Sequence, residues 1–249
     1  MKILYEDNHL LVVEKPPGLL AQRDRSGDAD LLTQLKGYIK EKYHKPGDVY
    51  LGLVHRLDRN AGGVMVFART SKAASRLSEQ IRTRTVGKGY LAVVRGCPPE
   101  PEGTLDHFLH KNSDSNLTAV VGQKTSGAQR AVLHYQVLET SSTGWSLVVI
   151  RLETGRPHQI RVQMAAVGCP LWGDRKYGGK AAGRDRFLGL WAYRLSLVHP
   201  IRGDTMDFRA WPPRSGPWES FSRLEELPDL LQAWDTVERS TSHVSKDQP

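Results

Sequence analysis

The sequence predicts an α+β protein. Short apolar, β-branched runs of strand length recur from the first residues to about residue 210, and segments between them carry apolar residues at helical spacing. Two of these runs, residues 131–138 and 145–152, are joined by a short loop of Thr, Ser and Gly, which is typical of an antiparallel hairpin. A chain of 249 residues is long enough to bury a large core.

Composition favours a globular protein, with 39% apolar and 25% charged residues. No apolar run approaches the length of a membrane span, and the N-terminus turns acidic at once, without a signal-peptide pattern. We therefore expect a cytoplasmic protein that does not bind membranes. Cys97 and Cys169 lie far apart and outside any metal-ligand spacing, which argues against both a disulfide framework and a zinc site.

Charge is unevenly distributed along the chain. Residues 1–218 contain 32 Lys and Arg against 20 Asp and Glu, whereas residues 219–249 contain 3 against 7. We therefore predict a basic domain over residues 1–218 and an acidic C-terminal extension over 219–249, whose last ten residues are disordered. A basic body without a membrane element indicates a polyanionic partner, most simply nucleic acid.

The N-terminal segment predicts two strands and a helix. Residues 3–14 contain two short apolar runs around a polar turn, and residues 15–18 follow as a rigid turn of Lys, two prolines and Gly. Apolar residues at helical spacing predict a helix over residues 31–42, for which Asp28 or Asp30 is the N-cap.

The most informative stretch is a charged turn between two predicted strands, residues 49–54 and 63–68. Its centre is Asp58, flanked by Arg56 and Arg59. A guanidinium close to a carboxylate keeps the carboxylate ionised, and an ionised, oriented carboxylate is a candidate nucleophile. The alternative is a turn carboxylate with an incidental surface ion pair.

A second helix is predicted to begin at Thr70 or Ser71, and a strand over residues 88–96 then holds Tyr90 on one side. Basic residues on or beside this helix either form a solvated face or contact phosphates. They are Arg69, Lys72, Arg76, Arg82, Arg84 and Lys88.

Residues 97–128 are rich in Pro, Gly, Ser, Asn and Lys, and predict a turn-rich excursion with only weak strands near Leu105 and residues 117–120. After the central hairpin, residues 188–197 and 206–210 predict two closing strands. A surface helix over residues 227–238 follows within the acidic extension.

A short helix after the hairpin is predicted to begin at Pro157 and to end before Gly168. Its spacing places Arg161 beside the buried apolar stripe. Because a buried unpaired charge is very costly, Arg161 requires an anionic partner. The distant Asp58 and the local Glu153 are both candidates.

Five segments occur in order between about residue 3 and residue 212. They are Lys15-Pro16-Pro17-Gly18-Leu19; His55-Arg56-Leu57-Asp58 followed by Gly62-Gly63-Val64; Lys88-Gly89-Tyr90-Leu91-Ala92; Thr154-Gly155-Arg156-Pro157-His158-Gln159-Ile160-Arg161-Val162; and Leu190 to Pro200. Together they resemble the RluA-type family of RNA pseudouridine synthases. The resemblance implies an α+β fold with a mixed, mainly antiparallel central sheet, flanking helices and loops, and an active-site cleft across the sheet.

The resemblance also implies roles for individual residues. Asp58 matches the catalytic aspartate, Tyr90 the aromatic residue that packs on the target base, and Arg161 the basic partner of the aspartate. Leu190 matches an apolar residue of the base pocket, and Arg56 an arginine associated with base flipping. Further residues expected to contact substrate or RNA are Arg59, Arg156, His158 and Gln159.

The sequence differs from the family pattern at Gln163, Cys169 and Trp191, where relatives often carry histidine. These positions lie outside the nucleophile motif, so we expect them to affect substrate preference rather than chemistry. Because the catalytic pattern begins near residue 3, we expect a stand-alone catalytic domain over residues 1–218 without an N-terminal S4-like module.

The implied reaction breaks the N-glycosidic bond of a uridine, turns the uracil and rejoins it through carbon. It needs neither cofactor nor metal, and we expect a monomer that isomerises uridines in ribosomal or transfer RNA after flipping them out of the strand. One alternative is a basic RNA-binding protein without catalysis. Another is a carboxylate glycosidase, which needs a second carboxyl about 5 to 5.5 Å away in retaining enzymes, and none lies near Asp58 in sequence.

Overall fold

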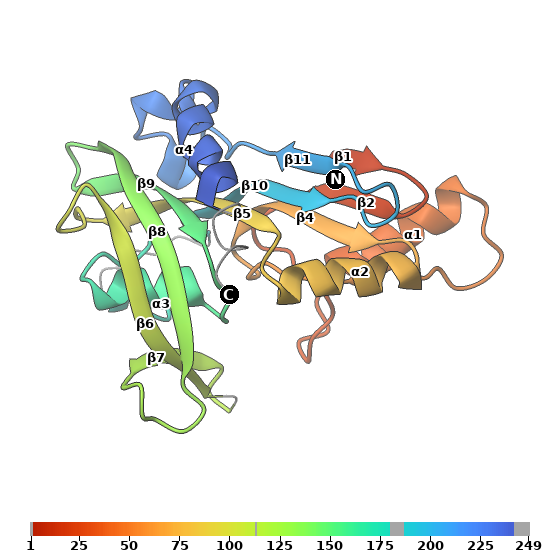
Figure 1. Cartoon of the computed structure of the whole chain (residues 1–249), viewed down its shortest axis with the longest axis horizontal. Coiled ribbons are helices and arrows are strands. Elements are labelled where there is room, and N and C mark those ends of the chain that lie inside the picture. Colours follow the sequence, from red (N-terminus) through yellow and green to blue (C-terminus); the bar gives the residue numbers. More distant parts are fainter. Residues whose placement is uncertain (1, 113, 180–186, 242–249) are drawn as a thin grey trace, which may run out of the picture.

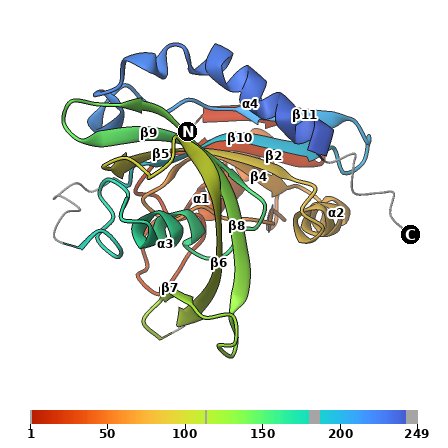
Figure 2. The ribbon, with the colours of Figure 1, turned by 60° about the vertical axis from the view of Figure 1, so that its left-hand side comes forward.

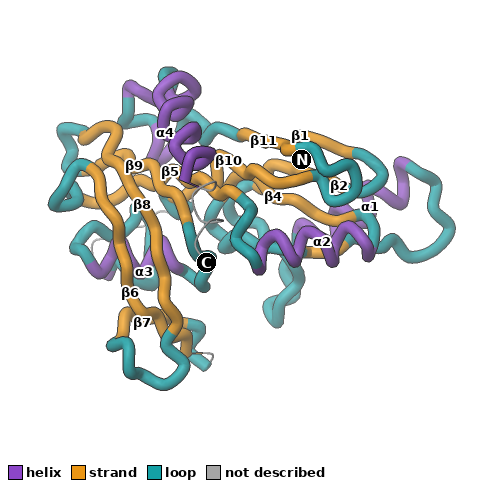
Figure 3. Tube along the Cα trace, in the orientation of Figure 1, coloured by secondary structure: helices purple, strands orange, loops and turns teal. Residues whose placement is uncertain are grey.

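The computed structural model describes residues 2–112, 114–179 and 187–241. A single sheet organises them, in the order β1-β2-β4-β10-β5-β9-β8-β6-β7, with β3 paired to β4 and β11 to β10. The strands are β1 Lys2–Glu6, β2 Leu10–Lys15, β3 Gly52–Leu53, β4 Gly62–Ala68, β5 Gly87–Arg95, β6 Glu102–Asn112, β7 Leu117–Val121, β8 Gln129–Thr140, β9 Trp145–Leu152, β10 Leu190–Val198 and β11 Thr205–Arg209. The β4–β10 pair is parallel and the other strand pairs are antiparallel, so the predicted mixed, mainly antiparallel sheet is confirmed. Figures 1 and 3 show how the strands and helices are arranged.

Helices cover both faces of this sheet. They are α1 Leu31–Lys42, α2 Ser71–Arg82, α3 Gln159–Ala166 and α4 Leu227–Thr241. Alternate residues of β2 show the division, because Leu11 packs in the cluster that includes α1 and α3, whereas Leu10 packs in the cluster that includes α2. Figure 2 shows α3 and α4 on opposite sides of the sheet. The described residues include no helix that is long and apolar enough to cross a membrane.

Helices α1 and α2 begin where the local capping rules predict, whereas α3 begins later than predicted. Asp30 accepts a hydrogen bond from the backbone N–H of Thr33, and Thr70 caps α2 in the same way. Helix α3 instead begins at Gln159, two residues after Pro157, because His158 adopts a left-handed backbone with φ of 54°.

The segment that carries β6 and β7 is more regular than the sequence predicts. Instead of a turn-rich excursion, β6 runs from residue 102 to 112 and pairs with β8 and β7 as a long arm that extends from the sheet (Figure 1). Gln163 of α3 fastens this arm, because its amide nitrogen lies 3.0 Å from the carbonyl oxygens of both Leu105 and Ala131. The arm therefore stands in a fixed position beside α3.

The acidic C-terminal segment is packed against the sheet. Phe221 and Leu227 are buried in the cluster that contains Trp191 and Tyr193 of β10, and the hydroxyl of Tyr193 donates to Asp235 at 2.7 Å. Helix α4 includes the first two of the last ten residues, where we predicted disorder, and residues 242–249 lie outside the described residues.

Two adjacent glycines allow β4 to cross β10 closely. A Cβ atom on Gly62 would lie 2.2 Å from the ring of Trp191, and one on Gly63, whose φ is +119°, would lie 2.2 Å from the carbonyl oxygen of Ala192. This approach brings the loop that precedes β4 to the middle of the sheet. The predicted strand over residues 49–54 is reduced to β3, so most of the segment leading to Asp58 is loop.

Candidate active site

Asp58 lies in the loop between β3 and β4, and its side chain is 28% exposed. Leu57 anchors the loop in the core beneath it. Nη1 of Arg161 donates to Oδ2 of Asp58 at 2.8 Å, across 103 positions of sequence. The sequence allowed two partners for Arg161, and Asp58 is the one of these two that it contacts. Glu153 contacts His134 instead, at 2.5 Å.

The other side of Arg161 is bound by an acid that the sequence analysis did not single out. Asp174 is fully buried and accepts two hydrogen bonds from Arg161, from Nε at 2.8 Å and from Nη2 at 2.7 Å. Burial alone would lower the pKa of Arg161, but the hydrogen bonds and charges of Asp174 and Asp58 outweigh it and raise this pKa. The guanidinium is thus a permanent cation held between one buried and one accessible carboxylate.

A signal for a second acid was present in the sequence. A guanidinium has five N–H donors, and one carboxylate cannot satisfy them in a buried position. Asp174 follows Gly173, which has φ of 69°. A Cβ at residue 173 would clash with the Phe187 carbonyl, so the turn at this position requires glycine, and it directs the loop back toward α3.

His158 stands on the other side of Asp58. Its Nε2 lies 3.9 Å from Oδ1 of Asp58, and its Nδ1 forms a 2.6 Å hydrogen bond with the hydroxyl of Tyr177. That hydroxyl also accepts from the backbone N–H of Thr118 in the arm, at 2.9 Å. Burial lowers the pKa of His158 and the charge of Asp58 only partly offsets this, so the ring is neutral at pH 7.

Tyr90 and Leu190 lie on neighbouring strands, β5 and β10, in the same cluster as Leu57 and the apolar side of α3. Both side chains are largely buried. Burial, with a further contribution from the charge of Asp58, raises the pKa of Tyr90 above its ordinary value. The fold thus brings an aromatic ring, an apolar side chain and the Asp58–Arg161 pair to one region.

The remaining predicted residues differ in accessibility. Arg56 is exposed, and the described part of the chain gives its side chain no hydrogen bond or ion pair. Arg59 donates to the Gly18 carbonyl at 3.1 Å and pairs with Asp28 at 2.7 Å. Gln159 is buried, and its amide oxygen accepts from Thr154 and the amide nitrogen donates to a β8 carbonyl, so it holds the loop before α3 in place.

Lys15, which the sequence analysis assigned only to a rigid turn, lies completely buried beneath the Asp58 loop. Its ammonium donates to the carbonyl oxygens of Pro16, Leu19 and Arg59 at 2.7 to 3.0 Å. Burial lowers the pKa of Lys15 to about 7, although the charge of Asp58 opposes this shift. The three bonds tie the N-terminal turn to the residue that follows Asp58.

The positions that differ from the family pattern have internal roles. Trp191 packs on the opposite face from Tyr90 and donates to the Ala210 carbonyl at 2.8 Å, and Gln163 holds the arm. Cys169 is buried in the cluster that contains Tyr90.

The chain resembles known proteins in both sequence and structure. A family model described as RNA pseudouridylate synthase matches residues 9–166. The chain is 34% identical to the uncharacterized RNA pseudouridine synthase YhcT of Bacillus subtilis, over 81% of this chain and 65% of that protein. It is also 34% identical to ribosomal large subunit pseudouridine synthase D of Zymomonas mobilis, over 86% of this chain and 70% of that protein. The chain therefore spans about two thirds of the length of these relatives.

Two solved structures share the fold. Human RNA Pseudouridylate Synthase Domain Containing 4 aligns with a TM-score of 0.70 and 29% identity, covering 86% of this chain and 89% of that one. Human RNA Pseudouridylate Synthase Domain Containing 1 aligns with a TM-score of 0.70 and 25% identity, covering 93% and 94%. Nearly the whole chain thus has the α+β architecture that the resemblance implied.

Proposed function

The chain belongs to the RNA pseudouridylate synthase family, whose members are isomerases, and we propose that it converts uridine to pseudouridine in large-subunit ribosomal RNA. Two features support this substrate. Relatives such as the Zymomonas mobilis protein are named for the large ribosomal subunit, and residues 1–218 carry a large excess of basic side chains suited to RNA.

The observation that carries the proposal is the 2.8 Å contact between Arg161 and Asp58, in a loop whose Leu57 packs in the same cluster as the buried Tyr90 ring. Attack on the sugar, attack on the base and assistance of glycal formation each require an oriented carboxylate beside the nucleotide. Asp58 meets this requirement, because Arg161 fixes one of its oxygens while the side chain remains accessible to substrate.

Arg161 acts by position and charge. Because Asp174 fixes two of its nitrogens, the third is presented to Asp58 in a set direction, and no rearrangement is needed when substrate binds. His158 contributes a neutral ring on the substrate side of Asp58.

Tyr90 and Leu190 would hold the detached uracil. Stacking of a base on an aromatic ring contributes roughly 1 to 3 kcal/mol whatever the base, and flipping a nucleotide out of its strand costs a few kcal/mol. Arg56, exposed and without a described partner, is suited to fill the vacated position in the strand, and Arg59 and Arg156 to contact the backbone. We assign Gln159 a positioning role in place of the RNA contact expected from sequence, since its amide is engaged internally.

A glycosidase would need a second reactive carboxyl near Asp58. Folding does bring Asp174 to the same guanidinium, but it is fully buried and both of its oxygens accept from Arg161. It therefore has no access to a sugar. We also propose that residues 1–218 are the catalytic domain and residues 219–249 a C-terminal extension, and that the enzyme is a cytoplasmic monomer that uses no cofactor or metal.

The test compares the purified wild type with Asp58→Ala on unmodified ribosomal and transfer RNA. Pseudouridines are mapped by carbodiimide modification and primer extension. We expect Asp58→Ala to abolish a ribosomal signal while RNA affinity stays within a few-fold, and Arg161→Met to slow catalysis more than it weakens binding. Modification by the Asp58→Ala protein would refute the nucleophile, and modification of transfer RNA alone would correct the substrate. RNA binding without any modification by the wild type would favour the non-catalytic alternative.

A further inference from the structure

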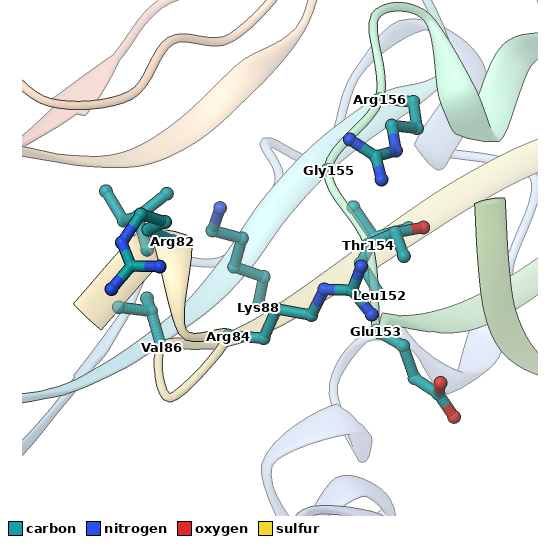
Figure 4. Close-up of a pocket in the computed structure, with 10 residues that line it drawn as sticks. Arg82, Arg84, Val86, Lys88, Leu152, Glu153, Thr154, Gly155 and Arg156 are labelled. Atoms are coloured by element: carbon teal, nitrogen blue, oxygen red, sulfur yellow. The ribbon is translucent and has the colours of Figure 1, made fainter. Parts of the chain in front are cut away.

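A cleft of about 390 Å³ opens between the end of α2, the start of β5 and the loop that leads into α3. Figure 4 shows its lining. Four cationic side chains line it, namely Arg82 at the end of α2, Arg84 in the turn that follows, Lys88 of β5 and Arg156 of the loop before α3. The cleft contains a single carboxylate, Glu153, which points away from these groups in Figure 4 and contacts His134 at 2.5 Å. The charge inside the cleft is therefore strongly positive.

Three of these cations have no counter-ion within the described ranges. The fourth cation, Arg82, has a counter-ion, because it pairs with Glu79 of the same helix. The side chains of Arg84 and Lys88 form no hydrogen bond or ion pair with any described residue, and among those residues the side chain of Arg156 donates only to the backbone carbonyl of Arg130.

The energetic cost of this arrangement is visible at two of the cations. Burial lowers the pKa of Lys88, and burial together with the neighbouring charge of Arg84 lowers the pKa of Arg156. Arg84 in addition holds a left-handed backbone with φ of 60°. Like charges that are partly desolvated and unpaired destabilise a folded chain, and an anionic ligand with several acceptor oxygens would relieve that cost.

The cleft adjoins the candidate active site on two sides. Lys88 and Tyr90 are two residues apart on β5, so their side chains leave the same face of the sheet about 7 Å apart along the strand. Arg156 stands two residues before His158 in the loop to α3, and a Cβ on Gly155 of that loop would lie 3.7 Å from Nζ of Lys88. The ammonium of Lys88 therefore lies beside the backbone that leads to His158.

We propose that Arg84, Lys88 and Arg156 form a subsite for one phosphodiester group of the RNA strand, next to the nucleotide that enters the site of Asp58. This inference rests on the proposed function and adds to it the group that fixes the strand beside the reacting uridine. The guanidinium groups of Arg84 and Arg156 are planar, bidentate donors, and the ammonium of Lys88 is a compact positive charge. Together they can bind the negatively charged oxygens of a phosphodiester.

The experiment measures binding of a 12-nucleotide oligouridylate, so that it does not depend on turnover or on the natural target. The variants are Lys88→Met, Arg84→Gln and Arg156→Gln, and the control is Arg95→Met, which removes one exposed positive charge from the other end of β5. We expect each cleft variant to weaken binding about tenfold at 100 mM KCl. Each should also reduce the slope of log Kd against log salt by about 0.7, whereas Arg95→Met changes neither.

A stability measurement separates this role from a structural one. Because Lys88 lacks a counter-ion, Lys88→Met should unfold at the same or a higher urea concentration than the wild type while it binds RNA less tightly. If Lys88→Met does not fold, Arg84→Gln and Arg156→Gln decide the matter. Affinities of the cleft variants no lower than that of Arg95→Met would overturn the subsite. Failure of the wild type to form pseudouridine would instead overturn the proposed function, and would leave the oligouridylate result in place.

Discussion

Replacement of Asp174 by Asn is the most direct test of how the site is built. Asp174 is fully buried, and it accepts two hydrogen bonds from Arg161 and two more from the backbone N–H groups of Lys176 and Tyr177. Asn keeps the shape of the side chain but turns one acceptor into a donor and removes the charge. Loss of one partner from a buried ion pair costs about 3 to 5 kcal/mol, because the other charge stays buried without compensation. For a chain of this size that cost lowers Tm by roughly 10 °C.

The assay is urea unfolding, combined with a single-turnover measurement of pseudouridine formation under conditions where the variant is folded. Asp204→Asn is a matched control, since Asp204 also pairs with both Nε and Nη2 of one arginine, Arg202, at 2.9 Å, but with half of its side chain exposed. An exposed pair of that kind contributes at most about 1 kcal/mol. If Asp174→Asn is no more destabilising than Asp204→Asn, the buried carboxylate does not hold Arg161 in the way we describe.

A double variant checks the physical cause of the loss. Arg161→Met alone leaves the Asp174 carboxylate buried and without its cation, whereas Arg161→Met combined with Asp174→Asn removes both charges. We therefore expect the double variant to be more stable than Arg161→Met, despite carrying an additional change. Additive losses in the two single variants would indicate packing, and not an uncompensated charge, as the source of the penalty.

Three further predictions follow from contacts around the site and the sheet. Tyr177→Phe removes the hydroxyl that holds the His158 ring, so we expect a loss of about 1 kcal/mol in stability and a severalfold slower single turnover at saturating RNA; an unchanged rate would contradict the tether. Burial alone would raise the pKa of Asp7, but hydrogen bonds from two backbone N–H groups lower this pKa to about 2. The ionised form of Asp7 therefore stabilises the fold above pH 4, and this stabilisation is lost as pH falls toward 2. The difference in unfolding free energy between wild type and Asp7→Asn should therefore be about 2 kcal/mol at pH 6 and about 1 kcal/mol smaller at pH 3, and a difference independent of pH would refute this assignment. Gly62→Ala places a methyl group 2.2 Å from the Trp191 ring and should cost about 3 kcal/mol in urea unfolding, whereas wild-type stability would show that the ring can move aside.

The elements that could be predicted from sequence are those whose signals are local. Helices α1 and α2 begin where Asp30 and Thr70 supply a side-chain oxygen to the first turn, and the β8–β9 hairpin follows from two apolar runs around a polar loop. Strand β6 was predicted only as a weak strand near Leu105, because most of its side chains are partly or wholly exposed. Backbone hydrogen bonds with β8 and β7 hold this strand in the sheet, and they do not require the alternation of apolar and polar residues by which a strand is predicted from sequence.

The sequence singles out Asp58 and Arg161, which the fold brings into contact, but not the residues that support them. The need of Arg161 for an anion follows from its place beside a buried stripe, but the choice between Asp58 and Glu153 required the fold, because one partner is 103 positions away. Asp174 and Lys15 were missed for a related reason. Each is bound to groups that the folded loops bring together. For Lys15 these groups are backbone carbonyls, and because every residue has one, the sequence does not show which carbonyls it binds.

Burial distinguishes the two carboxylates that share Arg161. Asp174 accepts two hydrogen bonds from the guanidinium, at 2.7 and 2.8 Å, and Asp58 accepts one at 2.8 Å. Asp174 has no exposed surface and uses both oxygens, whereas Asp58 is 28% exposed and Arg161 holds only one of its oxygens. The second oxygen of Asp58 faces the neutral His158 at 3.9 Å, and this distance is too long for a hydrogen bond. The buried acid therefore orients the cation, and the accessible acid keeps one oxygen free of the guanidinium, which under the proposed function is the oxygen that meets the nucleotide.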